Sequence, residues 1–425
     1  MGSNGGDGRV PGFTTSAPRP LRIHRLARGS FTTYMPHMHT RLVAERIAKS
    51  RTSVLLLGPR QVGKSTSCRA LDPDRYVDLA DQAEFLSYSK DPARLRRELG
   101  AGPARGLVVV DEVQRVPGLL NTIQSILDAP GNKLRFVLTG SSARKLKRGG
   151  ANLLPGRIIL EHMDPLTILE TGERIDLARA LRLGMLPGIF WGDEEAADVL
   201  GTYADVYLRE EIQAEAATKN LGGYARFLDA IAVASGQWIN YSKLASDIEV
   251  PKETLRRFVQ ILDDTLLAIR IPPFRPAAGV SRRVLQRERV LLFDVGVRNA
   301  LLGLHARPLG ADQTGSVFEQ WVILQVAYIG RALKKAWALS TYRSEAGAEV
   351  DLVLEGGFGT IGIEVKYSRN VSVRDTRGLV SLAEVMRGRK PVKQWIFYRG
   401  DRRQRFDNGV EAIPVLEGLH ALADL

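Results

Sequence analysis

The stretch SVLLLGPRQVGKST, residues 53–66, decides the fold, because an apolar run leads directly into a glycine-containing turn. The turn matches the spacing G-x-x-x-x-G-K-[ST] at Gly58, Gly63, Lys64 and Ser65. Such a turn wraps backbone N–H groups around phosphate oxygens, and the following helix directs the positive end of its dipole at them. The stretch therefore predicts a buried strand, a phosphate-binding P-loop and a helix in succession.

The side chains of this loop predict ATP and Mg²⁺ as cofactors. Lys64 would reach the β- and γ-phosphates, and the hydroxyl of Ser65 would bind Mg²⁺. The positions expected to contact the nucleotide are consecutive, namely Gly58, Pro59, Arg60, Gln61, Val62, Gly63, Lys64, Ser65 and Thr66.

Two carboxylates end a second apolar run, LVVVDE at residues 107–112. In a phosphoryl-transfer site Asp111 would hold Mg²⁺, and Glu112 would activate a water molecule. The alternative is an ordinary strand end with acids at the surface. A glutamate directly after the magnesium-binding aspartate predicts hydrolysis as well as binding, with Glu112 and Lys64 as catalytic residues.

Polar residues end the next apolar run in LTGSS, residues 138–142. Thr139, Ser141 or Ser142 would place a hydroxyl near the γ-phosphate as a sensor. Arg144 and Arg157 follow, and a cation stabilises the charge that develops on a transferred phosphoryl group. Arg157 is the preferred arginine finger, reaching a neighbouring subunit. A surface salt bridge is its alternative role.

Alternating strands and helices predict a doubly wound, mostly parallel α/β sheet over residues 39–164. The expected strands are 53–57, 76–79, 107–110, 134–138 and 157–160, with a helix at 117–128. Residues 1–38, rich in Gly, Pro, Ser and Arg, predict a disordered basic arm.

Two regions follow this P-loop domain. Residues 165–235 lose the strand pattern and predict a helical lid. Within residues 236–314, a short helix, a turn, a second helix and a strand resemble a winged helix-turn-helix. Lys252, Arg256 and Arg257 lie on the second helix. They would contact DNA, unless they form only a solvated face.

Residues 315–425 predict a separate small α/β domain. In TIGIEVKYS, alternation places Glu364 and Lys366 on one face of a strand, and Asp351 lies on the strand before it. The acids would hold Mg²⁺, and Lys366 would orient or deprotonate a water for phosphodiester attack. With Glu319 on the preceding helix, this is the PD-(D/E)xK nuclease pattern. The alternative is a degenerate fold with a structural Lys–Glu pair.

Charge and composition limit the classes of function. Among 425 residues, 60 Lys and Arg against 47 Asp and Glu give a net charge of +13, so nucleic acid, and DNA in particular, is an expected partner. Cys68 is the only cysteine, which excludes an internal disulfide and fits a reducing cytoplasm. Apolar runs are shorter than the roughly 18 residues of a membrane helix, so no membrane association is expected.

With these pieces in order, the chain resembles a family of bacterial and archaeal AAA+-type P-loop ATPases. Members carry a C-terminal domain of uncharacterised function that is similar to PD-(D/E)xK nucleases. The resemblance runs from Tyr34 to Asn370 and rests on GPRQVGKST, VVVDEVQ, LTGSS, LPGR, GQWINYSKLASDI, LLFDVGVRNALLGL, FEQWVI, SEAGAEVDLVL and IEVKYS. It implies ATP and Mg²⁺ at Gly63, Lys64, Ser65, Asp111 and Glu112. It also implies a nuclease-like site at Glu319, Asp351, Glu364 and Lys366.

One departure from this family is visible. Where members commonly read Gly-Gly-x-Pro-Glu, this chain has Gly184, Met185, Leu186, Pro187 and Gly188. The glutamate is missing, which affects the expected lid contacts and leaves the ATP site intact.

The leading hypothesis is an oligomeric, Mg²⁺-dependent ATPase that acts on DNA as a motor or remodeller. An arginine finger needs a neighbour, so a homo-oligomeric ring is expected, and a hexamer is one candidate. A regulatory switch with an inactive nuclease-like fold is the second hypothesis, and an ATP-gated, metal-dependent nuclease is the third.

Overall fold

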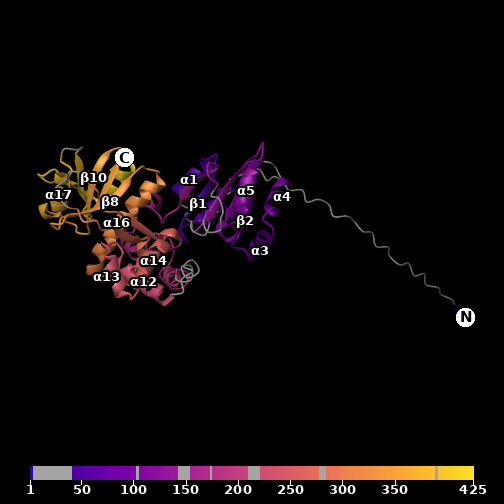
Figure 1. The fold of residues 1–425 in the computed structure, drawn as a ribbon, viewed down its shortest axis with the longest axis horizontal. Helices are drawn as coiled ribbons and strands as arrows, with labels where there is room; N and C mark the ends of the chain where they lie inside the picture. Colours follow the sequence, from indigo (N-terminus) through magenta and orange to yellow (C-terminus); the bar gives the residue numbers. More distant parts are fainter. Residues whose placement is uncertain are drawn as a thin grey trace. The chain divides into compact units, whose positions relative to one another are not determined.

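Five short segments form a parallel sheet in the computed structural model (Figure 1). They are β1 (Ser53–Leu57), β2 (Arg75–Asp78), β3 (Arg105–Asp111), β4 (Lys133–Gly140) and β5 (Ile158–His162), in the order β2-β3-β4-β1-β5. Every pairing between them is parallel. Because β4 lies between β1 and β3, the carboxyl ends of these three strands meet at one edge, where ligands of such sheets bind.

The structure describes residues 1–2, 41–101, 105–141, 154–172, 175–208, 221–276, 284–387 and 391–425. The basic arm predicted over residues 1–38 lies outside this part of the chain, apart from its first two positions. Ser142 and Arg144 also lie outside it. Residues 39–425 form one compact unit. In the described ranges, no helix is long and apolar enough to cross a membrane.

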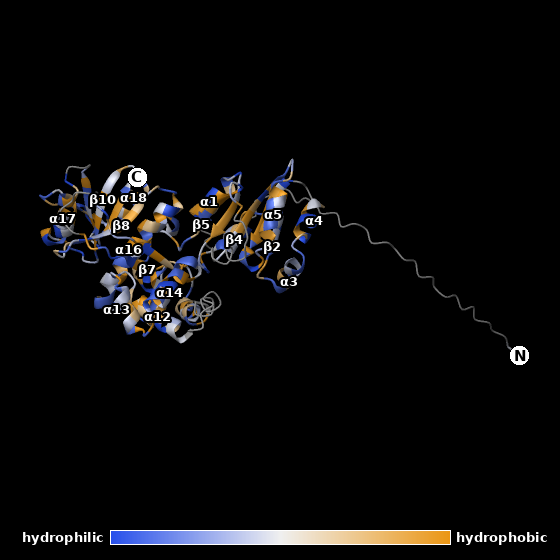
Figure 2. Ribbon diagram, viewed as in Figure 1, coloured by the Kyte–Doolittle hydropathy of each residue, from blue (hydrophilic) through white to orange (hydrophobic). Residues whose placement is uncertain are grey.

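Burial explains why the strands form where the sequence predicts them. All five residues of β1 are buried, as are the apolar centres of β3 and β4. Figure 2, which colours each residue by hydropathy, shows the strands of this sheet largely in orange, the colour of apolar residues. Continuous apolar runs are typical of strands that are covered on both faces. The accompanying helices are α1 (Leu42–Lys49), α2 (Lys64–Arg69), α3 (Gln82–Lys90), α4 (Arg94–Gly100) and α5 (Leu119–Leu127).

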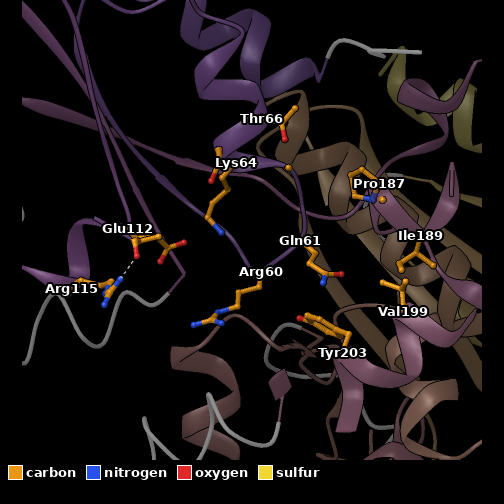
Figure 3. A pocket seen from close by; sticks show the side chains of 14 residues that line it. Arg60, Gln61, Lys64, Thr66, Glu112, Arg115, Pro187, Ile189, Val199 and Tyr203 are labelled. Carbon is orange, nitrogen blue, oxygen red and sulfur yellow. Dashed lines mark hydrogen bonds between the residues drawn. The ribbon is translucent and has the colours of Figure 1, made fainter. Parts of the chain in front are cut away.

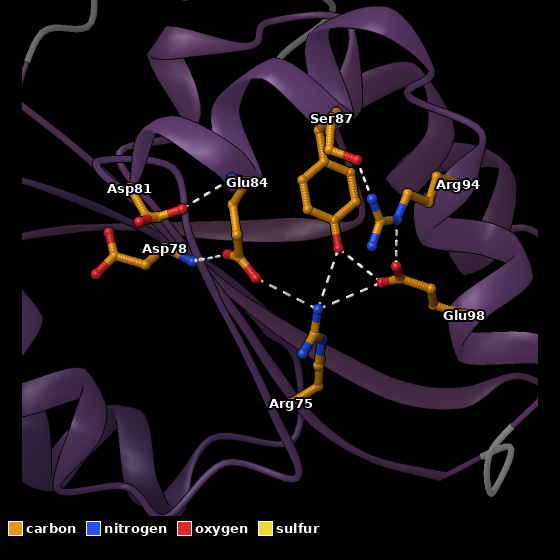
Figure 4. Close-up of polar contacts among 8 residues, drawn as sticks. Arg75, Asp78, Asp81, Glu84, Ser87, Arg94 and Glu98 are labelled. Atoms are coloured by element: carbon orange, nitrogen blue, oxygen red, sulfur yellow. Dashed lines mark hydrogen bonds and ion pairs between the residues drawn. The ribbon is translucent and has the colours of Figure 1, made fainter.

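Polar side chains hold α3 and α4 against β2 (Figure 4). Arg75, the first residue of β2, contacts Glu84 of α3 at 3.5 Å and Glu98 of α4 at 3.4 Å. The hydroxyl of Tyr88 donates to Glu98 (2.7 Å), and Arg94 pairs with the same carboxylate at 2.5 Å. These contacts lie at the start of β2, whereas ligands of parallel sheets bind at the strand ends. The network is therefore structural.

Helices dominate the region after the first sheet. They are α7 (Ile168–Thr171), α8 (Leu177–Leu183), α9 (Pro187–Phe190), α10 (Ala196–Thr202), the π-helical turn η2 (Tyr203–Leu208) and α12 (Leu221–Ala234). Next come α13 (Tyr241–Asp247), α14 (Lys252–Asp264), β6 (Ala268–Ile271), β7 (Arg289–Leu292) and α15 (Val295–Leu301). Strands β6 and β7 pair antiparallel. The predicted order of helix, turn, helix and strand thus appears in α13, α14 and β6.

A mixed sheet of six strands forms the C-terminal domain, in the order β12-β13-β11-β10-β9-β8. Its elements are α16 (Ala311–Ala332), β8 (Ala338–Arg343), β9 (Glu349–Gly356), β10 (Gly359–Lys366), α17 (Arg377–Val385), β11 (Val392–Tyr398), β12 (Gln404–Arg405), β13 (Glu411–Pro414) and α18 (Val415–Ala423). Ile361 and Ile363 share a core with residues of α16, whereas Gly362 faces Leu379 and Leu382 of α17. The alternation predicted for β10 is therefore present.

Candidate functional site

The turn between β1 and α2 has a backbone that requires both glycines of the motif. Gly63 has φ 92°, a left-handed conformation that favours glycine, and Lys64 begins α2 directly after it. A Cβ on Gly58 would lie 2.2 Å from the carbonyl oxygen of Met163. The P-loop pattern therefore has its expected place at the end of a buried strand.

The side chain of Lys64 is folded onto the loop itself. Lys64 is buried, and its Nζ donates to the carbonyl oxygens of Gly58 (2.9 Å) and Pro59 (2.8 Å). An ammonium group has three donors, so phosphate oxygens can replace these carbonyls without a change in the lysine's charge. Lys64 is thus placed to exchange loop contacts for nucleotide contacts.

Arg41 binds the P-loop from another direction and was not predicted from the sequence. Its guanidinium donates to the carbonyl oxygens of Val62 and Asp164, the latter at 2.6 Å, and pairs with Glu170 at 2.9 Å. Arg41 and Glu170 are both buried. Arg41 stands outside the motif, so only the fold reveals that it fixes the loop.

Two hydroxyl groups fix the carboxylate of Asp111 at the end of β3. Thr139 of β4 donates to Oδ1, and Tyr76 of β2 donates to Oδ2 at 2.6 Å. Burial and the contact with Asp111 raise the pKa of Tyr76, so the tyrosine keeps its proton. Thr139 Oγ1 also accepts the backbone N–H of Glu112 (3.0 Å). Thr139 therefore contacts the acidic pair, and its sensor role stays a prediction.

The oxygen donors beside the P-loop suit Mg²⁺, which prefers carboxylates, hydroxyls and phosphate oxygens. Ser65 lines the pocket described below, and Asp111 is held at the neighbouring strand end. Cys68 lies on the same helix as Ser65, and burial, followed by the charge of Asp111, raises its pKa to about 12. The thiol therefore stays protonated. Ser65 and Asp111 fit the magnesium role.

A pocket of about 740 Å³ lies beside the P-loop (Figure 3). Lys64 and Glu112 line one side of it, and the other side is lined by Pro187, Gly188, Ile189, Val199 and Tyr203. The second side includes the apolar side chains of Ile189 and Val199. Small-molecule pockets typically enclose roughly 300–1,000 Å³. A cavity with a cationic loop on one side and an apolar wall on the other suits a nucleotide.

A buried aspartate binds the loop that leads into this wall. Asp294, the N-cap of α15, accepts the backbone N–H of Met185 (2.7 Å) and two N–H groups of its own helix. Burial raises the pKa of Asp294 to about 6. Gly184 has φ 79°, and a Cβ there would lie 1.9 Å from an Asp294 oxygen. Gly184 is therefore required, and α15 is joined to the pocket wall.

The departure from the family pattern lies in the same wall. Pro187 begins α9, and both Pro187 and Gly188 line the pocket. Arg179 of α8 donates to the carbonyl oxygens of Ile189 (2.8 Å) and Phe190 (2.8 Å). The wall is thus held by α8 and α15, although position 188 has no side chain.

Arg157 lies at the opposite end of the sheet from the pocket. The residue after it, Ile158, pairs with Ser53, the first residue of β1, whereas the P-loop follows the last residue of that strand. The guanidinium forms a two-bond ion pair with Asp128 (2.5 and 3.0 Å). Arg157 therefore does not reach the nucleotide of its own chain, and its role in a neighbouring subunit stays a prediction.

The four predicted nuclease-like residues come together, but an arginine lies among them. Arg289 of β7 pairs with Glu319 of α16 and with Asp351 of β9 (3.4 Å). On β10, Lys366 pairs with Glu364 at 2.5 Å. Within the described part of the chain, no three Asp, Glu, His or Cys side chains are placed to hold a metal ion. The shared metal position expected for these acids stays a prediction.

Arg289 also connects the acids of the C-terminal domain to the loop after α12. Its Nε donates to the carbonyl oxygen of Gly236 (2.6 Å). Burial and the neighbouring charge of Asp351 raise the pKa of Glu319 and of Glu364 to about 8. The sequence pattern identified the acids. It missed Arg289, which belongs to a strand outside the nuclease-like pattern.

Comparisons with known proteins divide the chain into three matched regions. Residues 50–172 match the family described as "AAA domain". Residues 174–307 match the domain of unknown function DUF8612, and residues 314–417 match the domain of unknown function DUF4143. The chain therefore has an AAA domain followed by two domains of unknown function. The AAA domain suggests ATP binding and hydrolysis.

Relatives of the chain are uncharacterised. The "Uncharacterized protein Rv2008c" of Mycobacterium tuberculosis is 27% identical over 369 residues, which are 85% of this chain and 79% of that protein. The "Uncharacterized protein MJ1637" of Methanocaldococcus jannaschii is 25% identical over 222 residues, 48% of this chain and 45% of that protein. Among solved structures, the Walker-type ATPase PABY2304 of Pyrococcus abyssi matches with a TM-score of 0.42 and 16% identity, covering 62% of this chain and 94% of that one.

Proposed function

We propose that the chain is a Mg²⁺-dependent ATPase whose nucleotide state controls the two domains that follow the AAA domain. The observation that carries this proposal is the pocket that Lys64 and Glu112 line together with five residues between Pro187 and Tyr203. A P-loop without a catalytic acid would suit binding alone, whereas Glu112 lines the same cavity as Lys64.

The residues of the pocket have distinct roles in this proposal. Lys64 exchanges its bonds with loop carbonyl oxygens for bonds with phosphate oxygens. Ser65 and Asp111 would hold Mg²⁺, which would neutralise phosphate charge. Glu112 accepts a proton from the water that attacks the γ-phosphate. Arg41 keeps the loop in place through the carbonyl oxygen of Val62.

The same contacts support a route from the nucleotide to the C-terminal domain. Asp294 connects the pocket wall at Met185 to the start of α15. The strand just before α15 is β7, which carries Arg289. Arg289 in turn pairs with Glu319 and Asp351 of the C-terminal domain. A nucleotide that moves the wall therefore acts on a continuous set of buried contacts.

Nucleic acid, and DNA in particular, is the proposed partner. The order α12, α13, α14, β6 and β7 is that of a winged helix, in which the second helix of the helix-turn-helix enters the major groove. Lys252, Arg256 and Arg257 of α14 are exposed, and Arg256 also pairs with Glu253 (2.8 Å). The net charge of +13 adds attraction to a polyanion.

The buried Arg289 favours a binding module over a metal-dependent nuclease for the C-terminal domain. A guanidinium paired with Glu319 and Asp351 neutralises acids that a divalent cation would otherwise bring together. A regulatory switch with a protein partner is therefore the second candidate function.

ATP hydrolysis measured with and without DNA tests the proposal. We expect the wild type to hydrolyse Mg-ATP, single-stranded, duplex or branched DNA to accelerate it, and Lys64→Ala to abolish it. Slow hydrolysis with tight nucleotide retention and no response to DNA would favour the switch. No ATP binding by the wild type would refute both functions.

A further inference from the structure

Gln114 is buried beside the acidic end of β3 and belongs to none of the predicted site residues. It lies in the 3₁₀ turn η1 (Val113–Arg115), directly after the acidic pair, and is 7% exposed. Its amide nitrogen donates to Glu112 Oε2 and to Ser141 Oγ, the latter at 3.1 Å. One side chain thus joins the turn after β3 to the residue that follows β4.

The backbone of Glu112 is held in an uncommon conformation at this point. Glu112 has φ 58° and ψ 43°, in the left-handed region that residues with a side chain rarely adopt. Such conformations persist where the surroundings fix them, and they cluster at functional sites. The N–H of Glu112 is bound by Thr139 Oγ1, and its carboxylate is bound by Gln114. Backbone and side chain are therefore fixed separately.

The orientation of the Gln114 amide follows from its neighbours. If the amide were reversed, its oxygen would face the Glu112 carboxylate, and two acceptors would repel each other. In the observed orientation, Oε1 is buried without a hydrogen-bond partner among the described residues. It lies close to Gly140, where a Cβ would be 2.9 Å from it. An unpartnered buried oxygen is costly. The hydrogen bond that the amide nitrogen donates to Glu112 therefore explains why a glutamine stands at position 114 better than packing does.

We infer that Gln114 is a positioning residue for ATP hydrolysis, which holds the Glu112 carboxylate at the nucleotide pocket and links it to Ser141. The inference rests on the proposed role of Glu112 as the base. Glu112 lines the pocket and Gln114 does not, so Gln114 acts through Glu112. A misplacement of a reacting group by about 1 Å lowers the rate about 100-fold. Loss of the amide therefore lowers turnover.

Rate and affinity separate this role from a structural one. A glutamine needed only for packing would, when replaced, lower protein stability and nucleotide affinity together with turnover. A positioning residue changes kcat and leaves nucleotide affinity unchanged, because the P-loop contacts of Lys64 do not involve it.

The experiment compares Gln114→Met, which keeps the length and removes the amide, with Gln124→Met on α5. Gln124 belongs to the same domain and is not among the residues that line the pocket. We expect Gln114→Met to lower kcat for Mg-ATP about 10- to 100-fold. The Kd of Gln114→Met for a fluorescent ADP analogue should stay within about twofold of the wild-type value. For the control Gln124→Met, both kcat and Kd should stay within about twofold of the wild type.

Ser141→Ala provides a second variant that leaves Gln114 in place. Loss of one hydrogen bond to the amide should lower kcat about 3- to 10-fold. If Gln114→Met does not fold, an unchanged kcat in Ser141→Ala refutes the inference.

The remaining outcomes separate the inference from the proposed function. Wild-type kcat in Gln114→Met, or a parallel loss of kcat and affinity, overturns the inference alone, provided that Glu112→Gln is inactive. Wild-type turnover by Glu112→Gln removes the proposed base and the inference with it. Absence of hydrolysis by the wild type refutes both.

Discussion

Replacing Arg289 with methionine should destabilise the protein far more than the same change at Arg270. Arg289 has an 8% exposed side chain and pairs with Glu319 and Asp351. Arg270, on the neighbouring strand β6, also pairs with two acids but has a 43% exposed side chain. Methionine keeps most of the apolar stem in both variants, so the difference isolates the guanidinium.

Burial sets the expected magnitude of each change. Removing one partner of a buried ion pair costs about 3–5 kcal/mol, because an uncompensated charge stays behind. Exposed pairs are worth at most about 1 kcal/mol. We therefore expect Arg289→Met to lower the free energy of unfolding by about 3–5 kcal/mol and Arg270→Met by about 1 kcal/mol or less.

Urea unfolding followed by tryptophan fluorescence measures both variants, and the Trp238 ring lies 5.7 Å from the Arg289 guanidinium. A double variant sharpens the test. Adding Asp351→Asn to Arg289→Met removes the carboxylate that loses its cation, and it should restore roughly 0.5–3 kcal/mol.

Two results would refute this reasoning. Equal losses in Arg289→Met and Arg270→Met would show that Arg289 is not the cation that balances the acids. Stabilisation of the wild type by Mn²⁺ that disappears in Asp351→Asn would restore the metal site at these residues.

Three further changes have defined outcomes. Asp294→Asn should raise the Kd for ATP several-fold, because an amide nitrogen would face the N–H of Met185. Fluorescence titration measures this Kd. Because burial raises the Asp294 pKa to about 6 and unfolded aspartate titrates near about 4, the contribution of Asp294 to stability rises as pH falls from 6 to 4, so the wild type should gain stability relative to the variant over this range. Arg157→Ala should lower hydrolysis without weakening ATP binding if it acts on a neighbouring subunit, and a strict monomer by light scattering in ATP would exclude that role. DNA affinity should fall steeply with salt and weaken further in Lys252→Ala/Arg257→Ala, whereas affinity independent of salt would indicate a protein partner.

Local signals predicted the strands and the P-loop well. The run from Ser53 to Leu57 is continuous and apolar, and β1 has these bounds. Gly58 and Gly63 are needed by a close approach and a positive φ, which are properties of the motif itself. Alternation along β10 likewise predicted that Glu364 and Lys366 share a face.

Long-range contacts account for what the sequence could not predict. Arg41 touches Val62, and Arg289 touches Glu319 and Asp351, only because the chain folds back on itself. A lone arginine carries no motif in a chain with many basic residues. The nuclease-like spacing identified acids that do meet. Whether a metal ion or an arginine neutralises these acids depends on Arg289, which lies on β7, outside the nuclease-like pattern.

Single-turnover hydrolysis of Mg-ATP by the wild type and Glu112→Gln, with nucleotide affinity measured on the same samples, tests the central claim most directly. We predict that Glu112→Gln binds ATP within about threefold of the wild type and hydrolyses it at least about 100-fold more slowly, because it keeps the P-loop and loses the base. Equal rates in the two proteins would contradict the claim that this pocket catalyses hydrolysis through Glu112.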